Sequence, residues 1–325
     1  MKIGILSRNR GLYSTRRLAQ AARLRGHGVE IIDTMAVAVE VGVSEPPDSP
    51  VKVIAPQVSV AAIPGLRERR VTYLPHVDAI IPRIGASVTY YGMAVVRQFE
   101  ARDVLTTAAS QAIGRSRDKL HSMQLMSQAG LPIPKTAVIA GAQALYPAIQ
   151  AVGGPPVVIK LIQGTQGRGV FLARNLSTAA AVLEKLKQLK KQALLQEYVA
   201  EAGGKDTRII VVGDRCVAAM IRQAAAGEFR SNLHRGGTAV PATLDKETEH
   251  LAVAAAKAHG LNVAGVDVIQ SKRGPLLLEV NSSPGLKGIE GVTKVDVARE
   301  IIRFLEHAWS KQNRRHAGHR RRSWS

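Results

Sequence analysis

The chain has 325 residues, of which 46% are hydrophobic and 22% are charged, a composition typical of a folded globular protein and not of a disordered or collagen-like chain. Its 45 Lys and Arg residues outnumber its 25 Asp and Glu residues, which gives a formal net charge of +20. Such an excess favours an anionic partner, either a nucleic acid or an acidic or phosphorylated substrate. The single cysteine, Cys216, excludes a disulfide framework and a cysteine-based zinc site.

The N-terminal residues and the longest uncharged stretch predict a cytoplasmic location. The apolar run that opens the chain is too short for a secretory signal and is followed by Arg8 and Arg10. The longest uncharged stretch, residues 136–159, is interrupted by prolines and glycines, so it is not expected to span a membrane.

Residues 1–108 are predicted to form an N-terminal domain around a parallel sheet. An apolar run at residues 2–7, a helical stripe at residues 14–26 and an extended run at residues 29–33 give the strand–helix–strand order of parallel sheets. The proline-rich residues 43–66 are expected to form a long surface loop.

The rest of the chain is predicted to form two lobes and a tail. Residues 109–192, a central lobe, begin with a basic helical stretch and then alternate between strands and helices. Residues 193–309, a C-terminal lobe, hold several strand-like runs and one clear helix. Residues 310–325 carry six Lys or Arg residues and no acid, so they are expected to be disordered. This tail either has no dedicated partner or contacts RNA or an acidic protein electrostatically.

A predicted hairpin near the C-terminal end brings carboxylates together. If Ser271 pairs with Pro275, then Asp267 faces Glu279 across the two strands, and Asn281 shares their face because strand side chains alternate. Opposed carboxylates are destabilising unless something compensates them, and hard divalent cations prefer such oxygen ligands. The pattern predicts a metal site; the alternative is that Lys or Arg residues neutralise the pair. The opposite face is expected to be apolar and to hold Ala264, Val266, Val268, Leu276, Leu278 and Val280.

A glycine-rich loop follows a strand that carries a lysine. Gly164, Gly167 and Gly169 come shortly after Lys160, and their spacing matches neither a dinucleotide fingerprint nor a Walker loop. A loop that folds over a triphosphate, with Lys160 as a point charge, fits the pattern. A glycine hairpin without a ligand is the alternative.

The segment FRSNLHRGG gathers cationic and amide donors. It contains Arg230, Asn232, His234 and Arg235, and Arg222 precedes it on a predicted strand. Phosphoryl transfer depends mainly on positioning groups and neutralising charge, which these side chains can do. An exposed basic face is the alternative in a chain of this charge.

Together these segments resemble the RimK-type ligases of the ATP-grasp superfamily. The motifs RDKL, VVIKL with GTQGRGV, LLQEYV, FRSNLHRGG, AGVDVI and LLLEVNSSPGL stand in that family's order, and the resemblance covers roughly residues 1–309. It implies an α/β fold in which an N-terminal parallel-sheet pre-ATP-grasp domain precedes a two-lobed α+β ATP-grasp fold. It also implies an ATP-dependent carboxylate–amine ligase that works through an acylphosphate.

The resemblance implies a role for each matching residue. The ATP site it implies consists of Lys119, Lys160, Glu197, Tyr198, Val199, Ala200, Asp206, Arg230, Ser231 and Asn232. The catalytic residues it implies are Arg222, Arg230 and Asn232. Two Mg²⁺ or Mn²⁺ ions would be held by Asp267, Glu279 and Asn281.

The family also implies substrates. RimK-type ligases add L-glutamate to the C-terminus of the small-subunit ribosomal protein S-six or make poly-α-glutamate, and they are usually homo-oligomers. One alternative is another ATP-grasp ligase, either glutathione synthetase-like or a glutamate ligase with a small-molecule or carrier-protein acceptor. Another is a basic RNA-binding or ribosome-associated module without catalysis, although the 4% aromatic content argues against a stacking platform for single strands.

Overall fold

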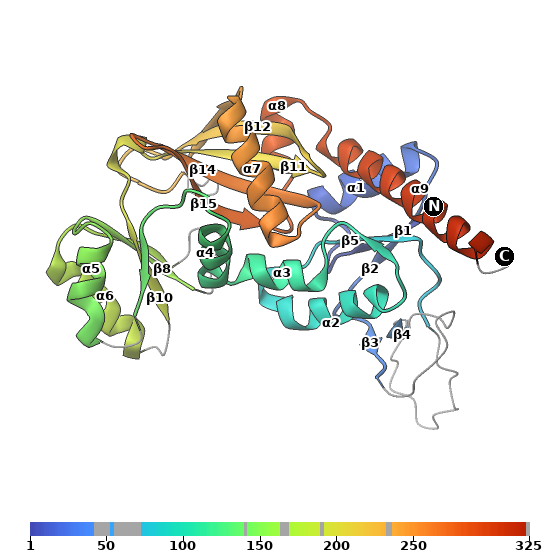
Figure 1. Cartoon of the computed structure of the whole chain (residues 1–325), viewed down its shortest axis with the longest axis horizontal. Helices are drawn as coiled ribbons and strands as arrows, with labels where there is room; N and C mark the ends of the chain where they lie inside the picture. Colours follow the sequence, from blue (N-terminus) through green and yellow to red (C-terminus); the bar gives the residue numbers. More distant parts are fainter. Residues whose placement is uncertain are drawn as a thin grey trace. The chain divides into compact units, whose positions relative to one another are not determined.

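The computed structural model describes residues 1–41, 53–54, 73–139, 142–162, 169–188, 192–231 and 236–322, with the backbone alone for residues 315–322. Gly164, Gly167, Asn232 and most of the proline-rich segment lie outside the described residues, as do the loops expected from them. The chain divides into two compact units, residues 1–113 with 298–325 and residues 114–297. Figure 1 labels the elements of both units. No helix within the described ranges is both long and apolar enough to cross a membrane.

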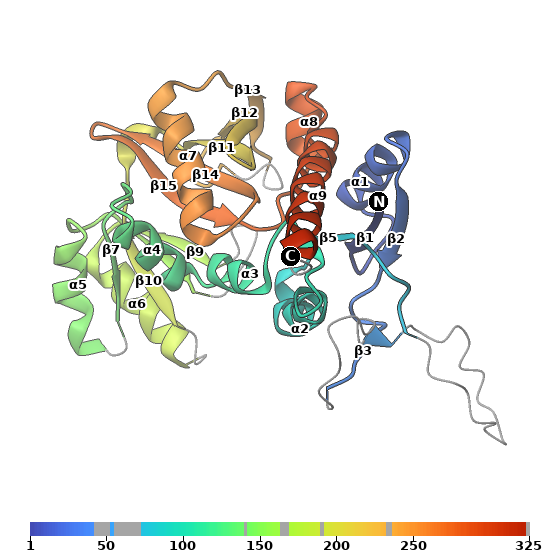
Figure 2. The same cartoon turned by 45° about the vertical axis from the view of Figure 1, so that its right-hand side comes forward.

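The N-terminal unit contains the parallel sheet expected from the sequence. Four strands lie in the order β2-β1-β5-β6, and every pair is parallel (Figure 2). The strands are β1 (Lys2–Leu6), β2 (Gly28–Ile32), β5 (Ala79–Pro82) and β6 (Leu105–Thr106), and the helices between them are α1 (Tyr13–Leu24) and α2 (Thr89–Glu100). The short strands β3 (Ala38–Val39) and β4 (Val53–Ile54) pair with each other, and helix α3 (Ser110–Arg117) leads into the second unit.

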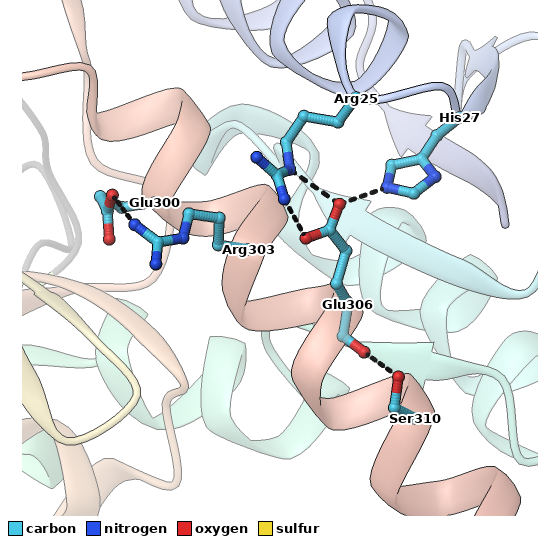
Figure 3. A network of polar contacts seen from close by, with 6 residues as sticks. All are labelled: Arg25, His27, Glu300, Arg303, Glu306 and Ser310. Atoms are coloured by element: carbon cyan, nitrogen blue, oxygen red, sulfur yellow. Dashed lines mark hydrogen bonds and ion pairs between the residues drawn. The ribbon is translucent and has the colours of Figure 1, made fainter.

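Helix α9 (Val297–Arg322) belongs to the N-terminal unit from Ala298 onward, although it lies at the other end of the sequence. Its Ile301, Ile302 and Leu305 are fully or almost fully buried. Glu306 accepts two hydrogen bonds of 2.7 Å from the Nε and Nη2 atoms of Arg25, and its Oε1 lies 2.7 Å from Nε2 of His27 (Figure 3). The hydrogen bonds from Arg25 are the main reason that the pKa of Glu306 is lowered. Apolar burial and a charged clamp therefore both hold α9 in place.

The same helix corrects one expectation. Residues 310–322 continue α9, whereas the sequence predicts a disordered tail from residue 310. Arg, Lys, Gln and Ala are good helix formers, and a helix that is already nucleated extends at little cost. Gln312 also donates a 2.8 Å hydrogen bond to the carbonyl of Asp103. The basic composition therefore does not prevent helix formation when the preceding turns are anchored.

The first sheet of the second unit is antiparallel, in the order β7-β10-β8-β9. Its strands are β7 (Thr136–Val138), β8 (Val157–Leu161), β9 (Val170–Ala173) and β10 (Ala193–Glu197). The helices α5 (Leu145–Ala151) and α6 (Leu176–Gln188) pack against it through buried aliphatic side chains, including Ile149, Leu186 and Ile159. β10 therefore belongs with β8, although the boundary expected after residue 192 would separate them.

The second sheet has five antiparallel strands in the order β13-β12-β11-β14-β15. They are β11 (Lys205–Val212), β12 (Arg215–Gln223), β13 (Thr238–Pro241), β14 (Val263–Ser271) and β15 (Gly274–Asn281). Three helices of this unit remain: α4 (Lys119–Gln128), α7 (Lys246–His259) and α8 (Lys287–Thr293). Asp118 starts α4 because its carboxylate accepts the backbone N–H of His121, and this cap splits the expected helical stretch at residues 110–129.

The hairpin β14–β15 pairs Asp267 with Glu279 as predicted, but by a different route. Ser271 pairs with Gly274 and not with Pro275, so the turn has two residues. A β-bulge next to Asp267 then inserts one residue into β15 and restores the expected pairing.

This bulge changes which leucines face the core. Leu276 lies opposite Ile269 and packs with it against Val199 and Ala202. Leu278, which the bulge leaves without a partner across the strands, lines the cavity described below. The expectation that Leu276 and Leu278 lie on the apolar face opposite Asp267 is therefore wrong, because alternation holds only up to the bulge.

A buried histidine connects α7 to α4. His259 is completely buried, and its ring nitrogens lie 2.8 Å from the Ala255 carbonyl and 2.8 Å from the Ser122 hydroxyl. Because a carbonyl only accepts, Nδ1 carries the proton and Nε2 accepts from Ser122. Burial is the main reason that the pKa of His259 is lowered, so the folded protein holds the neutral ring.

We expect the free energy of unfolding to decrease as the pH falls below 6.5, the ordinary pKa of histidine. In that range the unfolded chain binds a proton at this ring before the folded chain does. His259→Gln should be destabilised by roughly 1–3 kcal/mol at neutral pH and should lose part of this pH dependence. Urea unfolding above and below pH 6.5 measures both effects. An unchanged pH slope in the variant would contradict the assignment, and Ser122→Ala tests the bond alone.

Candidate active site

One cavity of the second unit is lined by residues from both of its sheets and from α4. Eleven residues predicted for the site lie around it: Lys119, Lys160, Glu197, Tyr198, Val199, Asp206, Arg222, Arg230, Ser231, Asp267 and Glu279. Ala200 begins the short 3₁₀ turn at residues 200–202 and does not line the cavity, whereas Ala202 does. Asn281 ends β15 outside the lining, and Asn232 lies outside the described residues.

Two lysines supply positive charge to this cavity. Lys160 on β8 donates a 2.5 Å hydrogen bond to Oε1 of Gln196 on the neighbouring strand β10. Burial lowers the pKa of Lys160 to about 8, although the negative charge of Glu279 opposes that shift. Lys119 donates to the carbonyl of Ile162 at 3.3 Å, and burial also lowers its pKa. Both cations are therefore poorly hydrated, and an anionic ligand would stabilise them.

Four charged side chains form a buried ladder across β12, β11 and β14. Arg222 on β12 donates to both carboxylate oxygens of Asp206, at 2.7 and 2.5 Å, and its Nη2 lies 3.0 Å from Oδ2 of Asp267. Arg208 makes a second two-bond contact with Asp267. Each ladder step joins residues that are directly opposed, Asp206 with Arg222 and Arg208 with Asp267. Burial lowers the pKa of Arg222, but the two aspartates more than offset this, so the net shift is upward.

The predicted metal ligands differ in how they are held. Asp267 is 4% exposed and engaged by Arg208 and Arg222, as in the alternative in which arginine neutralises the carboxylate pair. The side chain of Glu279 makes no hydrogen bond or ion pair with any residue in the described ranges. Its charge partly offsets the lowering of the pKa of Lys160 and Lys119 by burial. The described chain holds no cluster of three or more His, Cys, Asp or Glu residues that could bind a metal.

The donor set nevertheless fits a hard divalent cation. Asp267 and Glu279 face each other across the strands, and Asn281 is two positions from Glu279 on the same strand. Two carboxylates and an amide are oxygen donors, and Mg²⁺ commonly takes only one or two carboxylates and completes its shell with water and phosphate oxygens. Because Arg208 already occupies both oxygens of Asp267, a cation would have to share or replace that contact.

Part of the cavity lining is apolar. Met123, Ile269, Leu278 and Val199 contribute aliphatic side chains to the lining. Such a wall, next to the backbone of residues 197–199, suits a flat heteroaromatic ring that makes few polar contacts.

Arg230 lines the cavity and is fixed by several contacts. It makes a two-bond ion pair with Glu228, donates to the Val170 carbonyl at 3.1 Å, and lies over the Phe229 ring at 5.3 Å. The hydrogen bonds from Arg230 lower the pKa of Glu228 to about 2. Arg230 is therefore a prepositioned cation whose present partner is a carboxylate, and an anionic ligand would compete with Glu228 for it.

The sequence reasoning missed several residues that shape the site. Arg208, Gln196, Phe229 and Leu278 are among them. Arg208 could have been predicted from the sequence. It is two residues from Asp206 on one strand, so the two side chains lie on the same face. The others depend on tertiary contacts and give no such signal.

Comparison with known protein families assigns the chain to a family. Residues 116–305 match the family described as RimK-like ATP-grasp domain. The chain belongs to this family. Residues 1–48 and 62–113 match the RimK PreATP-grasp domain, so the two RimK domains lie in the predicted order and the predicted fold class is confirmed.

Individual relatives agree with this assignment. A protein of Marinomonas sp. (strain MWYL1) named "Probable alpha-L-glutamate ligase" is 51% identical over 306 residues, which cover 94% of this chain and 95% of the relative. A RimK domain ATP-grasp protein from Sphaerobacter thermophilus shares the fold with a TM-score of 0.69 at 20% identity, over 94% of this chain and 99% of that chain. The structure of the ATP-grasp ligase PsnB with a precursor variant, Mg and ADP has a TM-score of 0.69 at 19% identity. The match covers 95% of this chain and 98% of that chain. As a RimK-like ATP-grasp protein, the chain is an ATP-dependent carboxylate–amine ligase.

The lowered pKa of Lys160 predicts a pH-dependent affinity for ATP. Because the lysine titrates at about pH 8 in the unliganded protein, ATP affinity should fall as the pH rises through 8 and the charge is lost. Lys160→Arg should keep the affinity nearly constant across that range, because arginine stays protonated. Calorimetric titration with ATP on both sides of pH 8 tests this. Equal slopes in wild type and variant would show that Lys160 does not contact the nucleotide.

The buried ladder predicts a large effect on stability. Arg222→Gln leaves Asp206 and Asp267 buried with too little positive charge, so we expect it to lower the free energy of unfolding by about 3–5 kcal/mol. Arg174→Gln, at an exposed position directly after β9, should change it by about 0.5 kcal/mol or less. Urea denaturation compares the two variants. A similar small loss in both would mean that the ladder is not a stabilising unit.

Proposed function

We propose that the protein adds L-glutamate to a carboxylate acceptor, either the C-terminus of ribosomal protein S-six or a growing poly-α-glutamate chain. The observation that carries the proposal is the meeting of Lys160, Lys119 and the Asp267–Glu279 pair in one cavity whose lining also includes apolar side chains. Relatives near 50% identity that bear the name alpha-L-glutamate ligase over almost their whole length support glutamate as the amine.

In this proposal the cavity orients ATP by its two chemical ends. The adenine lies against the apolar part of the lining, beside Val199 and Leu278, and Asp206 lies near the ribose. The phosphates lie toward Lys160 and Lys119, whose charges are already desolvated and therefore interact strongly with an anion. Binding ATP would thus relieve an electrostatic penalty that the empty cavity carries.

The charge that develops during phosphoryl transfer also needs neutralising groups. When bound, two Mg²⁺ or Mn²⁺ ions at Asp267, Glu279 and Asn281 would screen the phosphate oxygens. Arg222 and Arg230, with Asn232, are proposed to face the transferred phosphoryl group. Arg230 would take this role by exchanging Glu228 for phosphate; its side chain is 21% exposed in the ion pair.

The proposed reaction has two steps, phosphoryl transfer to the acceptor and then formation of the amide bond. An acceptor carboxylate oxygen attacks the γ-phosphorus of ATP, the bond to the β,γ-bridging oxygen breaks, and ADP leaves. The neutral amine of glutamate attacks the carbonyl carbon of the resulting acylphosphate, a C–N bond forms, the C–O bond breaks, and phosphate leaves as the amine loses a proton. The protein contributes position and charge and needs no covalent nucleophile. Burial raises the pKa of Cys216 to about 11, which agrees with a thiol that takes no part.

Three further features of the proposal follow from the family likeness. We propose a homo-oligomer, a cytoplasmic location where ATP is available, and a contact of the basic residues 310–325 with RNA or the ribosome. The proposed ATP binding and the proposed ligation chemistry do not depend on any of these three features.

The decisive experiment measures ADP release with ATP, Mg²⁺ and L-glutamate, with and without ribosomal protein S-six, and follows the acceptor by mass spectrometry. We expect ADP release and growth of the acceptor mass in steps of one glutamate residue. Glu279→Gln should reduce both by at least about a hundredfold, because it removes one carboxylate from the centre of the cavity. Glu249→Gln, the same change on the exposed face of α7, is the matched control.

The acceptor and the chemistry are separated by the same data. If the protein makes free polyglutamate and leaves S-six unmodified, glutamate ligation is supported and S-six is excluded as the acceptor. ADP release only with a small-molecule or carrier-protein acceptor would replace the proposed acceptor class. No ADP release with any acceptor would overturn the proposal.

A further inference from the structure

A basic hollow lies along helix α1, wholly within the N-terminal unit. It encloses about 700 Å³ and is lined by Arg10, Tyr13, Arg16, Arg17 and Arg23 together with small and uncharged residues. No carboxylate contributes to its lining as far as the chain is described. We call this feature the α1 hollow.

Three arginines of the α1 hollow, Arg10, Arg16 and Arg23, lack the acidic partner that Arg25 of the same unit has. Arg25, just beyond α1, is held by Glu306 through two 2.7 Å bonds (Figure 3). Arg10, Arg16 and Arg23 are exposed, and none of them pairs with a carboxylate in the described part of the chain. Helix α1 itself contains no acidic residue. The hollow therefore concentrates positive charge that the fold does not neutralise.

The side chains are spaced along one stripe. Arg16, Gln20 and Arg23 stand at i, i+4 and i+7, so they point to one side of the helix and span about 10.5 Å along its axis. Arg17 donates to Oε1 of Gln20 at 2.6 Å, which fixes a guanidinium beside that stripe. An extended polypeptide presents side chains on one side every 6.6–6.8 Å, roughly, so such a stripe can meet two successive carboxylates of a glutamate chain.

We propose that the α1 hollow binds an acidic polypeptide, namely the glutamate chain that the protein itself produces. The choice of this ligand rests on the proposed function. Every cation in the lining is arginine, whose planar fork binds a carboxylate through two parallel hydrogen bonds. Tyr13 is the one aromatic side chain named in that lining, so the hollow offers no platform for stacking successive bases of RNA.

Retaining the product would affect the length of the chain that is made. A chain held at the α1 hollow dissociates more slowly, so its carboxylate end stays at high local concentration near the enzyme for the next addition. Weakening the hollow should then shorten the products without changing the chemistry of a single addition.

The test uses the full-length protein and the double variant Arg16→Gln/Arg23→Gln. Binding of a fluorescent α-linked oligoglutamate is measured by anisotropy without ATP or metal, so that it does not depend on turnover. We expect the dissociation constant to rise about tenfold in the double variant, since two exposed ion pairs are lost. Arg97→Gln/Lys257→Gln removes two charges from exposed positions on α2 and α7 and should leave binding within about twofold.

A second measurement compares product lengths by mass spectrometry. Shorter products from Arg16→Gln/Arg23→Gln, at an unchanged rate of ADP release for a short acceptor, support the proposal. Unchanged oligoglutamate binding in this variant overturns it. A larger loss of binding to a single-stranded RNA oligonucleotide than to oligoglutamate also overturns it, in favour of a nucleic acid. If the wild type adds no glutamate at all, the proposed function fails, and the anisotropy data still decide the binding claim separately.

Discussion

The catalytic unit depends on one physical constraint, the need to keep buried charges paired. Arg222 sits between Asp206 and Asp267 and is almost fully buried. Removing such ions from water is expensive and is offset only by close, well-directed partners. The antiparallel pairing of β11 with β12 places Asp206 directly opposite Arg222, and its pairing with β14 places Arg208 directly opposite Asp267. The sheet register and the charge pattern therefore constrain each other, and a slip of one residue would bury unpaired charges.

This constraint also explains why the cavity is ready for an anion. Lys160 lies on the neighbouring sheet, where burial weakens its hold on a proton and only more distant carboxylates oppose that effect. In the ladder, Asp206 and Asp267 form ion pairs with arginines. Their negative charge therefore compensates the positive charge of Lys160 and Lys119 only weakly. Preorganised cations that are not fully satisfied by the protein are an efficient way to stabilise phosphate charge, because they need little rearrangement when the ligand arrives.

The sequence predicted those parts of the site that follow from local periodicity. Strand alternation and a turn near Gly274 predicted the pairing of Asp267 with Glu279, although in the structure this pairing also depends on the bulge, which compensates for the shorter turn. The motif order was enough to recognise the fold. The bulge was not predictable, because an inserted residue leaves the composition of both strands unchanged. It placed Leu276 opposite Ile269 and left Leu278 in the lining of the cavity. The helical continuation through residues 310–322 was missed because anchoring by residues such as Glu306 depends on partners near the other end of the chain.

Helix α9 has a consequence for the order in which the protein can be completed during synthesis. The N-terminal unit consists of residues 1–113 and 298–325, so its last helix leaves the ribosome only after all of residues 114–297. At typical translation rates this interval lasts on the order of ten to forty seconds. Until then Arg25 and His27 lack Glu306, and the surface that covers Ile301, Ile302 and Leu305 is open to solvent or to chaperones. The nascent chain therefore passes through a stage in which residues 114–297 can already be folded while the N-terminal unit still lacks helix α9.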